Sequence, residues 1–200
     1  MNRFPVCFQH DSMLCGITCL LMICKYFGRD YTLESLSKIC FATTEGVSML
    51  GINEAARILG FQTVSARATI EELSETPLPC ILYWNQNHFV VLYKMKKGKK
   101  FYIADPGKGK TTYNLEEFKR HWISTRSNDE DKGIAMFFET TPAFFTYQME
   151  GEDRQKEKRS FKFLFRYFKK YRKAFSWIVL GLLAGSALQL VLPFLTQSIV

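Results

Sequence analysis

The sequence predicts an α+β domain followed by a transmembrane helix, and three observations lead to this prediction. Helix signals dominate the first third of the 200 residues, and strand signals dominate the stretch from residue 80 to residue 140. Helices that precede an antiparallel sheet are typical of an α+β domain. The last 27 residues, 174–200, contain no charged side chain, and an apolar run of this length can cross a membrane.

Helices are expected mainly before the sheet. The first covers 15–27, where apolar residues recur on one stripe and Gly28 ends the helix. Two more are expected at 32–39 and 48–59, because Thr and Ser at their first positions are favoured N-caps. A brief helix follows Thr69, which begins a capping-box pattern. A later helix begins at Asn114 and runs through Trp122, with Glu117 at the third position.

Strands are expected where aromatic and β-branched residues are enriched, at 61–66, 80–84, 88–95, 100–104 and 133–140. Lys96-Lys97-Gly98-Lys99 is expected to form the turn of a hairpin between the third and fourth of these strands. The polar segment 127–132 is expected to be an exposed loop, and the charged segment 146–160 is expected to be a linker.

The net charge of +8 is concentrated in one segment. Residues 154–173 hold ten basic side chains and one acidic side chain, a local charge of +9, whereas the other residues hold 17 basic and 18 acidic side chains. The basic character therefore does not indicate a nucleic-acid-binding face on the main domain. Because these cations precede the charge-free run, they predict that the N-terminal end of the membrane helix lies in the cytoplasm.

We therefore expect three parts. Residues 1–145 form the main domain, 146–173 form a basic juxtamembrane linker, and 174–200 form the first transmembrane helix of a membrane domain. The chain is expected to be the front portion of a larger membrane protein. No signal peptide is expected, because the first eight residues lack an apolar core.

The cysteines do not predict a metal site. The six are Cys7, Cys15, Cys19, Cys24, Cys40 and Cys80, and they form no CxxC pair and no zinc-ligand spacing. Cys15 and Cys19 lie one helical turn apart, so metal binding remains a weak alternative. Reduced thiols in a cytosolic domain agree with the missing signal peptide.

Four residues form a candidate catalytic set. Cys15 begins the first predicted helix, where unpaired N–H groups and the macrodipole lower the pKa of a thiol. Gln9 lies upstream, and its amide can donate to a developing oxyanion. His88 offers a base and Asp105 a carboxylate to orient it. Nucleophile, base, orienter and oxyanion donor are the parts of a cysteine acyl-transfer enzyme.

The predicted hairpin brings His88 and Asp105 together. With the turn at 96–99, Met95 faces Lys100 and Val90 faces Asp105, which makes His88 a diagonal neighbour of Asp105. Diagonal Cβ atoms lie about 7–8 Å apart, a gap that an imidazole and a carboxylate can close. A register shifted by two residues would place the two directly opposite. In either register both side chains emerge at the same end of neighbouring strands.

Each of these residues also has a structural explanation when it is taken alone. A cysteine at a helix start, a histidine that opens an apolar strand and an Asp-Pro-Gly turn are common in folded domains. The order Gln, Cys, His and polar orienter, however, is the order found in papain-like enzymes. The other histidines lack this context: His10 is expected to line the cleft, and His121, in a charged helix, is expected at the surface.

Several motifs carry a resemblance to a known family. They are Gln9-x-Asp11-x-x-x-Cys15-Gly16, Pro79-x-Ile81-x-x-Trp84-x-x-x-His88-Phe-Val-Val-Leu, Ile103-x-Asp105-Pro106, and Glu139-x-Thr141-Pro142, followed after the basic stretch by Leu192-Pro-Phe-Leu-Thr-Gln197. In this order they resemble the bacteriocin-processing cysteine peptidases, the N-terminal cytosolic domains of peptidase-containing ABC transporters. Two features depart from the family pattern: Leu14 stands where an acidic residue is common, and 124–132 resembles an insertion.

The resemblance implies a papain-like fold and a specific activity. Cys15, His88 and Asp105 would cut a precursor peptide after the Gly-Gly-type site that ends its leader, Gln9 would bind the oxyanion, and the attached transporter would export the product. It implies no cofactor in this region, with ATP and Mg²⁺ bound only by a nucleotide-binding domain beyond Val200. It also implies a homodimer through the transporter domain, contact with membrane lipid, and a place in the bacterial inner membrane.

Two other functions remain open on the sequence. The first is a non-catalytic domain that docks secretion substrates without cutting them. The second is a different papain-like enzyme, such as an amidase or a transglutaminase, fused to a membrane anchor. No substrate-binding residue is predicted beyond the four catalytic candidates.

Overall fold

The computed structural model describes residues 4–40, 46–96, 98–127 and 130–147, together with six residues in the region 176–186. The chain divides into two units, Met1–Met149 and Glu150–Val200. Within the described residues, no helix is long and apolar enough to cross a membrane. The predicted membrane helix at 174–200 lies outside the described residues except at those six positions, as does most of the predicted linker. Both stay predictions.

Five of the helices described in the first unit begin where the sequence predicts them. They are α1 (Cys15–Tyr26), α2 (Leu33–Ile39), α3 (Met49–Ile58), α4 (Ile70–Glu75) and α5 (Leu115–Trp122), with α6 (Pro142–Thr146) at the end of the unit. Thr32, Thr69 and Asn114 form capping boxes, and the Ser48 hydroxyl accepts from the Gly51 N–H. Each cap satisfies backbone donors that the first helical turn leaves unpaired, which fixes where these helices start.

Seven strands form one antiparallel sheet. They are β1 (Phe61–Ala68), β2 (Cys80–Trp84), β3 (His88–Lys96), β4 (Lys100–Asp105), β5 (Gly109–Asn114), β6 (Ile123–Ser127) and β7 (Glu130–Thr140). Their order across the sheet is β1-β7-β2-β3-β4-β5, and β6 pairs with β7. The predicted α+β class, with N-terminal helices packed on an antiparallel sheet, is confirmed.

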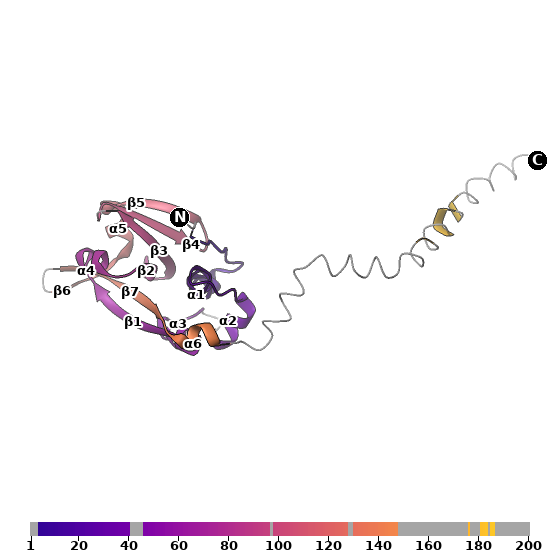
Figure 1. Cartoon of the computed structure of the whole chain (residues 1–200). Coiled ribbons are helices and arrows are strands. Elements are labelled where there is room, and N and C mark those ends of the chain that lie inside the picture. The colour runs from indigo at the N-terminus through magenta and orange to yellow at the C-terminus, as the bar shows by residue number, and fades with distance from the viewer. Residues whose placement is uncertain are drawn as a thin grey trace, which may run out of the picture. The chain divides into compact units, whose positions relative to one another are not determined.

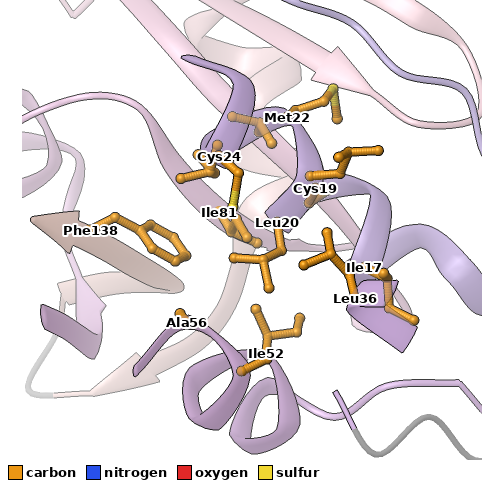
Figure 2. Close-up of a cluster of buried hydrophobic side chains, with 14 of the residues drawn as sticks. Ile17, Cys19, Leu20, Met22, Cys24, Leu36, Ile52, Ala56, Ile81 and Phe138 are labelled. Carbon is orange, nitrogen blue, oxygen red and sulfur yellow. The ribbon is translucent and has the colours of Figure 1, made fainter. Parts of the chain in front are cut away.

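Two hydrophobic clusters cover the two faces of the sheet, and side chains alternate between them along each strand. In β2, Ile81 joins the cluster that contains α1, α2 and α3, whereas Leu82 joins the cluster that contains α4 and α5. The helix α1 is buried along most of its length, from Cys15 to Cys24. Figure 2 shows α1 side chains converging with residues of α2, α3, β2 and β7. This burial holds the first residue of α1 in a fixed place against the sheet.

Three elements differ from the sequence-based expectations. The segment 127–132 was expected to be a loop, but its described residues belong to strands: Ser127 ends β6 and 130–132 begin β7, and Arg126 pairs with Asp131 across the two strands. The described residues of the predicted insertion, 124–127 and 130–132, are therefore in paired β-strands. β5 and α6 were not expected. β5 alternates between half-buried and exposed polar residues at a sheet edge, so it carries no apolar signal.

The register of the β3–β4 hairpin differs from the predicted one next to the turn and agrees with it at the other end. Next to the turn, Met95 pairs with Phe101 rather than with Lys100. A register shift between Leu92 and Lys94 then moves the strands by one residue, so that Val91 pairs with Ala104. That pairing belongs to the predicted register, in which His88 and Asp105 are diagonal neighbours. The irregularity therefore restores the predicted geometry where it matters for the candidate site.

Candidate active site

Cys15 is the first residue of α1 and is 8% exposed. A short 3₁₀ turn, η1 (Ser12–Leu14), leads into it, and the Asp11 carboxylate caps that turn by accepting from the Met13 N–H at 3.1 Å. Leu14, the N-cap residue of α1, provides no side-chain cap. The first-turn N–H groups of α1 are therefore left to interact with the sulfur of Cys15.

Leu14 stands where an acidic residue is common in the family pattern, and the structure explains this difference. Leu14 is half-buried and packs against the hydrophobic cluster that contains α1. Its side chain contributes to the core instead of placing a charge beside the thiol.

His88 and Asp105 are hydrogen-bonded, as the predicted register requires. His88 Nε2 lies 2.9 Å from Oδ1 of Asp105, and the same oxygen accepts from the Gly107 N–H at 2.8 Å. Asp105 is 4% exposed, although it is charged. Because Nε2 faces the carboxylate, Nδ1 is the ring nitrogen left to serve the thiol of Cys15.

The surroundings of Cys15 favour its thiolate. Burial by itself would raise the pKa of the thiol. The hydrogen bond with His88 and the backbone N–H groups of Phe89 and Gly16 outweigh burial, so the pKa of Cys15 is lowered from its ordinary value. A thiolate at this position is available to act as a nucleophile.

The pKa values of His88 and Asp105 are shifted in the directions that favour their charged forms. Burial would lower the pKa of His88, but hydrogen bonds to Asp105 and Cys15 raise it to about 9. Burial would raise the pKa of Asp105, but hydrogen bonds from His88 and from the Gly107 N–H lower it. The three shifts therefore favour a thiolate, an imidazolium and a carboxylate, and the three groups titrate as a coupled set.

The pKa values of the other buried cysteines are raised rather than lowered. Burial raises the pKa of Cys19, Cys24 and Cys80, and it raises the pKa of Cys40 to about 12. These four thiols stay protonated near neutral pH and behave as small apolar side chains. Among the five buried cysteines, Cys15 alone has the chemical character of a nucleophile.

Gln9 lies against the turn that follows Asp105. Its backbone N–H donates to the Pro106 carbonyl at 3.0 Å, and its Nε2 lies 3.7 Å from the position that a Cβ on Gly107 would take. Its Oε1 is buried and has no hydrogen-bond partner among the described residues. This oxygen can only accept a hydrogen bond, whereas the oxyanion role predicted for Gln9 requires its Nε2–H donors.

A shallow groove extends from this region and was not predicted from the sequence. Its volume is about 460 Å³, and it is lined by Phe4, Pro5, Val6, Phe8, Gly109 and Lys110. Phe8 is 60% exposed and directly precedes Gln9, so the groove adjoins the candidate site. No sequence motif identified it, because its walls come from an irregular N-terminal segment and an edge strand.

Comparison with known proteins agrees with this geometry. Residues 3–127 match the model of the peptidase C39 family. A probable microcin-H47 secretion/processing ATP-binding protein of Escherichia coli is 36% identical over 121 residues, which cover 60% of this chain. A colicin V secretion/processing ATP-binding protein of the same species is 35% identical over 121 residues, again 60% of this chain. Each alignment covers 17% of the relative's length.

One solved structure is similar over most of the described fold. It is the crystal structure of a double glycine motif protease from an AMS/PCAT transporter in complex with the leader peptide. The two are 34% identical with a TM-score of 0.61, and the match covers 70% of this chain and 93% of that one. The helices, the sheet and the Cys15–His88–Asp105 arrangement therefore occur in a chain whose sequence and fold both match a known group. This chain belongs to the peptidase C39 family, and its N-terminal unit is a cysteine peptidase domain.

Proposed function

We propose that this domain removes the leader peptide, after a Gly-Gly-type site, from a bacteriocin-like or signalling precursor. One observation carries the chemical part of the proposal: Cys15, with a lowered pKa, is hydrogen-bonded to His88, which is held by the buried carboxylate of Asp105. The similarity to a double glycine motif protease bound to its leader supports the substrate class.

Each residue would have a defined part in the reaction. The Cys15 thiolate attacks the carbonyl carbon of the leader's last residue and forms a tetrahedral oxyanion. The His88 imidazolium gives its proton to the leaving amine, so the C–N bond breaks and the mature peptide departs. The leader remains as a thioester on Cys15. His88, now neutral, takes a proton from water, whose oxygen attacks the thioester and releases the leader acid.

Asp105 and Gln9 would support these steps without forming covalent bonds. Asp105 holds the imidazole through Nε2, which keeps the other ring nitrogen toward the thiol. The side-chain amide of Gln9 and the backbone N–H of Cys15 would donate to the oxyanion. One such donor contributes a factor of about 10²–10³ in rate.

The specificity can be tested with two peptides. The 200-residue chain, purified in detergent, is incubated with a synthetic precursor whose leader ends in Gly-Gly and with a matched peptide that ends in Val-Val. We expect cleavage after Gly-Gly and at least about 100-fold slower cleavage after Val-Val, since branched side chains would crowd the carbonyl that Cys15 attacks. Equal rates on both peptides would contradict the proposed substrate class.

The domain is also proposed to belong to an exporter. The named relatives are secretion/processing ATP-binding proteins, and this chain aligns with 17% of their length. The charge-free run 174–200 and its basic flank support a membrane helix with the peptidase domain in the cytoplasm. ATP and Mg²⁺ binding, a homodimer formed by the membrane domain, contact with lipid and a place in the inner membrane would follow from this proposal.

The topology can be tested by labelling whole cells from outside with a membrane-impermeant thiol reagent. A cysteine engineered at Ser160 should stay unlabelled until the cells are opened, whereas one placed after Val200 should react in intact cells. Labelling at Ser160 in intact cells would contradict both the cytoplasmic placement and the exporter proposal.

A further inference from the structure

The turn that leads into His88 has an unusual backbone. Asn85 and Gln86 lie between β2 and β3, and their φ angles are 50° and 59°. Non-glycine residues seldom take positive φ, and glutamine lacks the short polar side chain that helps asparagine to do so. Such conformations persist where neighbouring groups hold them, and they gather at functional sites. The contacts that hold this turn therefore bear on how His88 is placed.

The last turn of α5 holds Asn85 through two hydrogen bonds. The Asn85 N–H donates to the His121 carbonyl at 2.9 Å, and Nδ1–H of His121 donates to Oδ1 of Asn85 at 2.7 Å. The two residues are 36 positions apart in the sequence, so this is a tertiary contact. We call this pair of hydrogen bonds the Asn85–His121 clasp. On β2, the Tyr83 hydroxyl donates to the Gln86 carbonyl and holds the next residue of the turn.

The His121 ring is itself fixed by aromatic neighbours. It stacks on Trp84 with ring centroids 5.1 Å apart and an interplanar angle of 18°, and it meets the edge of Tyr113 at 5.6 Å. His121 is half-buried, which differs from the surface position expected for a residue of a charged helix. The physical reason is that the polar end of α5 packs on the buried ring of Trp84. α5 lies against the sheet at β2, β4 and β5 (Figure 1).

This contact is linked directly to His88. Trp84 is the cross-strand partner of His88, so the residue under the His121 ring and the candidate base face each other across the hairpin. The turn 85–87 closes the chain between them, and the Asn87 N–H donates to the Trp84 carbonyl at 3.2 Å. The backbone position of His88 is therefore set by the turn on one side and by pairing with β2 on the other.

We propose that Asn85 and His121 are positioning residues that keep the His88 imidazole in line between Asp105 and Cys15, an inference that rests on the proposed function. His88 must present Nε2 to Asp105 while its other nitrogen faces the thiol. Without the clasp, the turn can relax from its left-handed conformation and move the start of β3. A misplacement of about 1 Å in such a set costs about 100-fold in rate. Neither residue touches the reacting groups.

Four substitutions separate the clasp from simple packing. Asn85→Gly accepts positive φ but removes the side-chain acceptor, whereas Asn85→Asp keeps the acceptor. His121→Phe keeps the stack on Trp84 but removes the Nδ1–H donor, whereas His121→Asn keeps a donor near the Nδ1 position and removes the ring. Arg120→Ala is the matched control, because Arg120 is exposed on the same helix and lies next to His121.

The main readout needs no peptide substrate. The rate at which iodoacetamide alkylates Cys15 is measured by mass spectrometry between pH 5 and pH 10 in the 200-residue chain. The thiolate is the reacting form, so the acid side of this profile reports how well His88 stabilises it. The kcat and KM for the Gly-Gly peptide are measured in parallel, and circular dichroism shows that each variant is folded.

Asn85→Gly and His121→Phe should lower Cys15 alkylation about 10-fold on the acid side of the profile and lower kcat about 10-fold, with little change in KM. Asn85→Asp and His121→Asn should restore most of both values, and Arg120→Ala should match the wild type. The double variant Asn85→Gly/His121→Phe should be no worse than either single variant, since both remove one interaction.

Folded Asn85→Gly and His121→Phe variants with wild-type alkylation profiles would overturn the proposal, even if their melting temperatures fell. Full additivity in the double variant would overturn it as well. If the alkylation profiles shift as expected but no variant, wild type included, cleaves the Gly-Gly peptide, the clasp stands and the proposed substrate falls.

Discussion

His88 Nε2 lies 2.9 Å from Oδ1 of Asp105, and that oxygen also accepts from the Gly107 N–H at 2.8 Å. The carboxylate is buried, yet it is held as an anion by two donors. This arrangement fixes one ring nitrogen of His88 and leaves the other to Cys15. The predictions about the chemistry of this domain depend on this relationship.

Removing the carboxylate should cost more than neutralising it. Asp105→Ala removes the acceptor for Nε2 and should lower kcat about 100-fold, because the imidazole is no longer oriented. Asp105→Asn can still accept from Nε2 through its amide oxygen and should keep a larger part of kcat. Both variants should lower the pKa of His88, which NMR titration of the imidazole measures. An alanine variant with wild-type kcat would show that Asp105 is only structural.

The pH profile of cleavage should follow the ion pair. The pKa of His88 is raised to about 9, so kcat/KM should fall as the pH rises through about 9, where the imidazolium that protonates the leaving amine is lost. Protonated His88 also stabilises the fold, because the pKa of His88 is higher in the folded chain than its ordinary value of 6.5. This stabilisation is complete below about pH 6.5 and is lost as the pH rises through about 9. In Cys15→Ala, the pKa of His88 should be lower, since its thiolate partner is gone. An unchanged pKa would contradict the ion pair.

Gln9 should matter for turnover more than for binding. Gln9→Ala should lower kcat by about 10²–10³ with a small change in KM, because an oxyanion donor acts mainly on the charged intermediate. Gln9→Glu should be at least as slow, since a carboxylate cannot donate to the oxyanion. Steady-state kinetics with the Gly-Gly peptide measures both. A large rise in KM at constant kcat would instead assign Gln9 to substrate binding.

Two glycines provide a matched test of how α6 closes the fold. Gly28 and Gly60 have φ of +91° and +90°, but a Cβ at Gly28 would meet nothing within 4 Å, whereas one at Gly60 would overlap the backbone N of Phe144. Gly28→Ala should cost about 1–2 kcal/mol from its backbone conformation alone. Gly60→Ala should cost clearly more in urea unfolding, because α6 must move. Equal losses would show that α6 adds little to stability.

Much of the fold follows from local sequence signals, and so does the core of the candidate site. The N-cap residues Thr32, Ser48, Thr69 and Asn114 mark helix starts by a mechanism confined to one turn, so their positions were predictable. The meeting of His88 and Asp105 was predictable because a hairpin fixes its register through one turn. Even there, the pairing next to the turn differs from the predicted register by one residue, and the irregularity between Leu92 and Lys94 brings the strands back into that register.

The features that the sequence did not predict depend on contacts between distant segments of the chain. β5 and β6 are polar strands that form because a neighbour offers unpaired backbone groups, which composition does not reveal. The contact of His121 with Asn85 joins residues 36 positions apart, and neither residue has an unusual local sequence. The groove beside Phe8 likewise brings an irregular N-terminal segment to an edge strand. The sequence therefore showed which side chains could take part in the chemistry, but it did not show the contacts between distant segments that hold those side chains in place.

The most direct test of the central claim is to identify the atom that carries the leader during turnover. The 200-residue chain is mixed with the Gly-Gly peptide, quenched in acid within the first turnover, and digested for mass spectrometry. We expect the leader as a thioester on Cys15, and neither adduct nor cleavage in Cys15→Ala, while alanine at Cys7, Cys19, Cys24, Cys40 or Cys80 leaves both intact. Cleavage by Cys15→Ala at the wild-type rate, or an adduct on another cysteine, would contradict the assignment of Cys15 as the nucleophile.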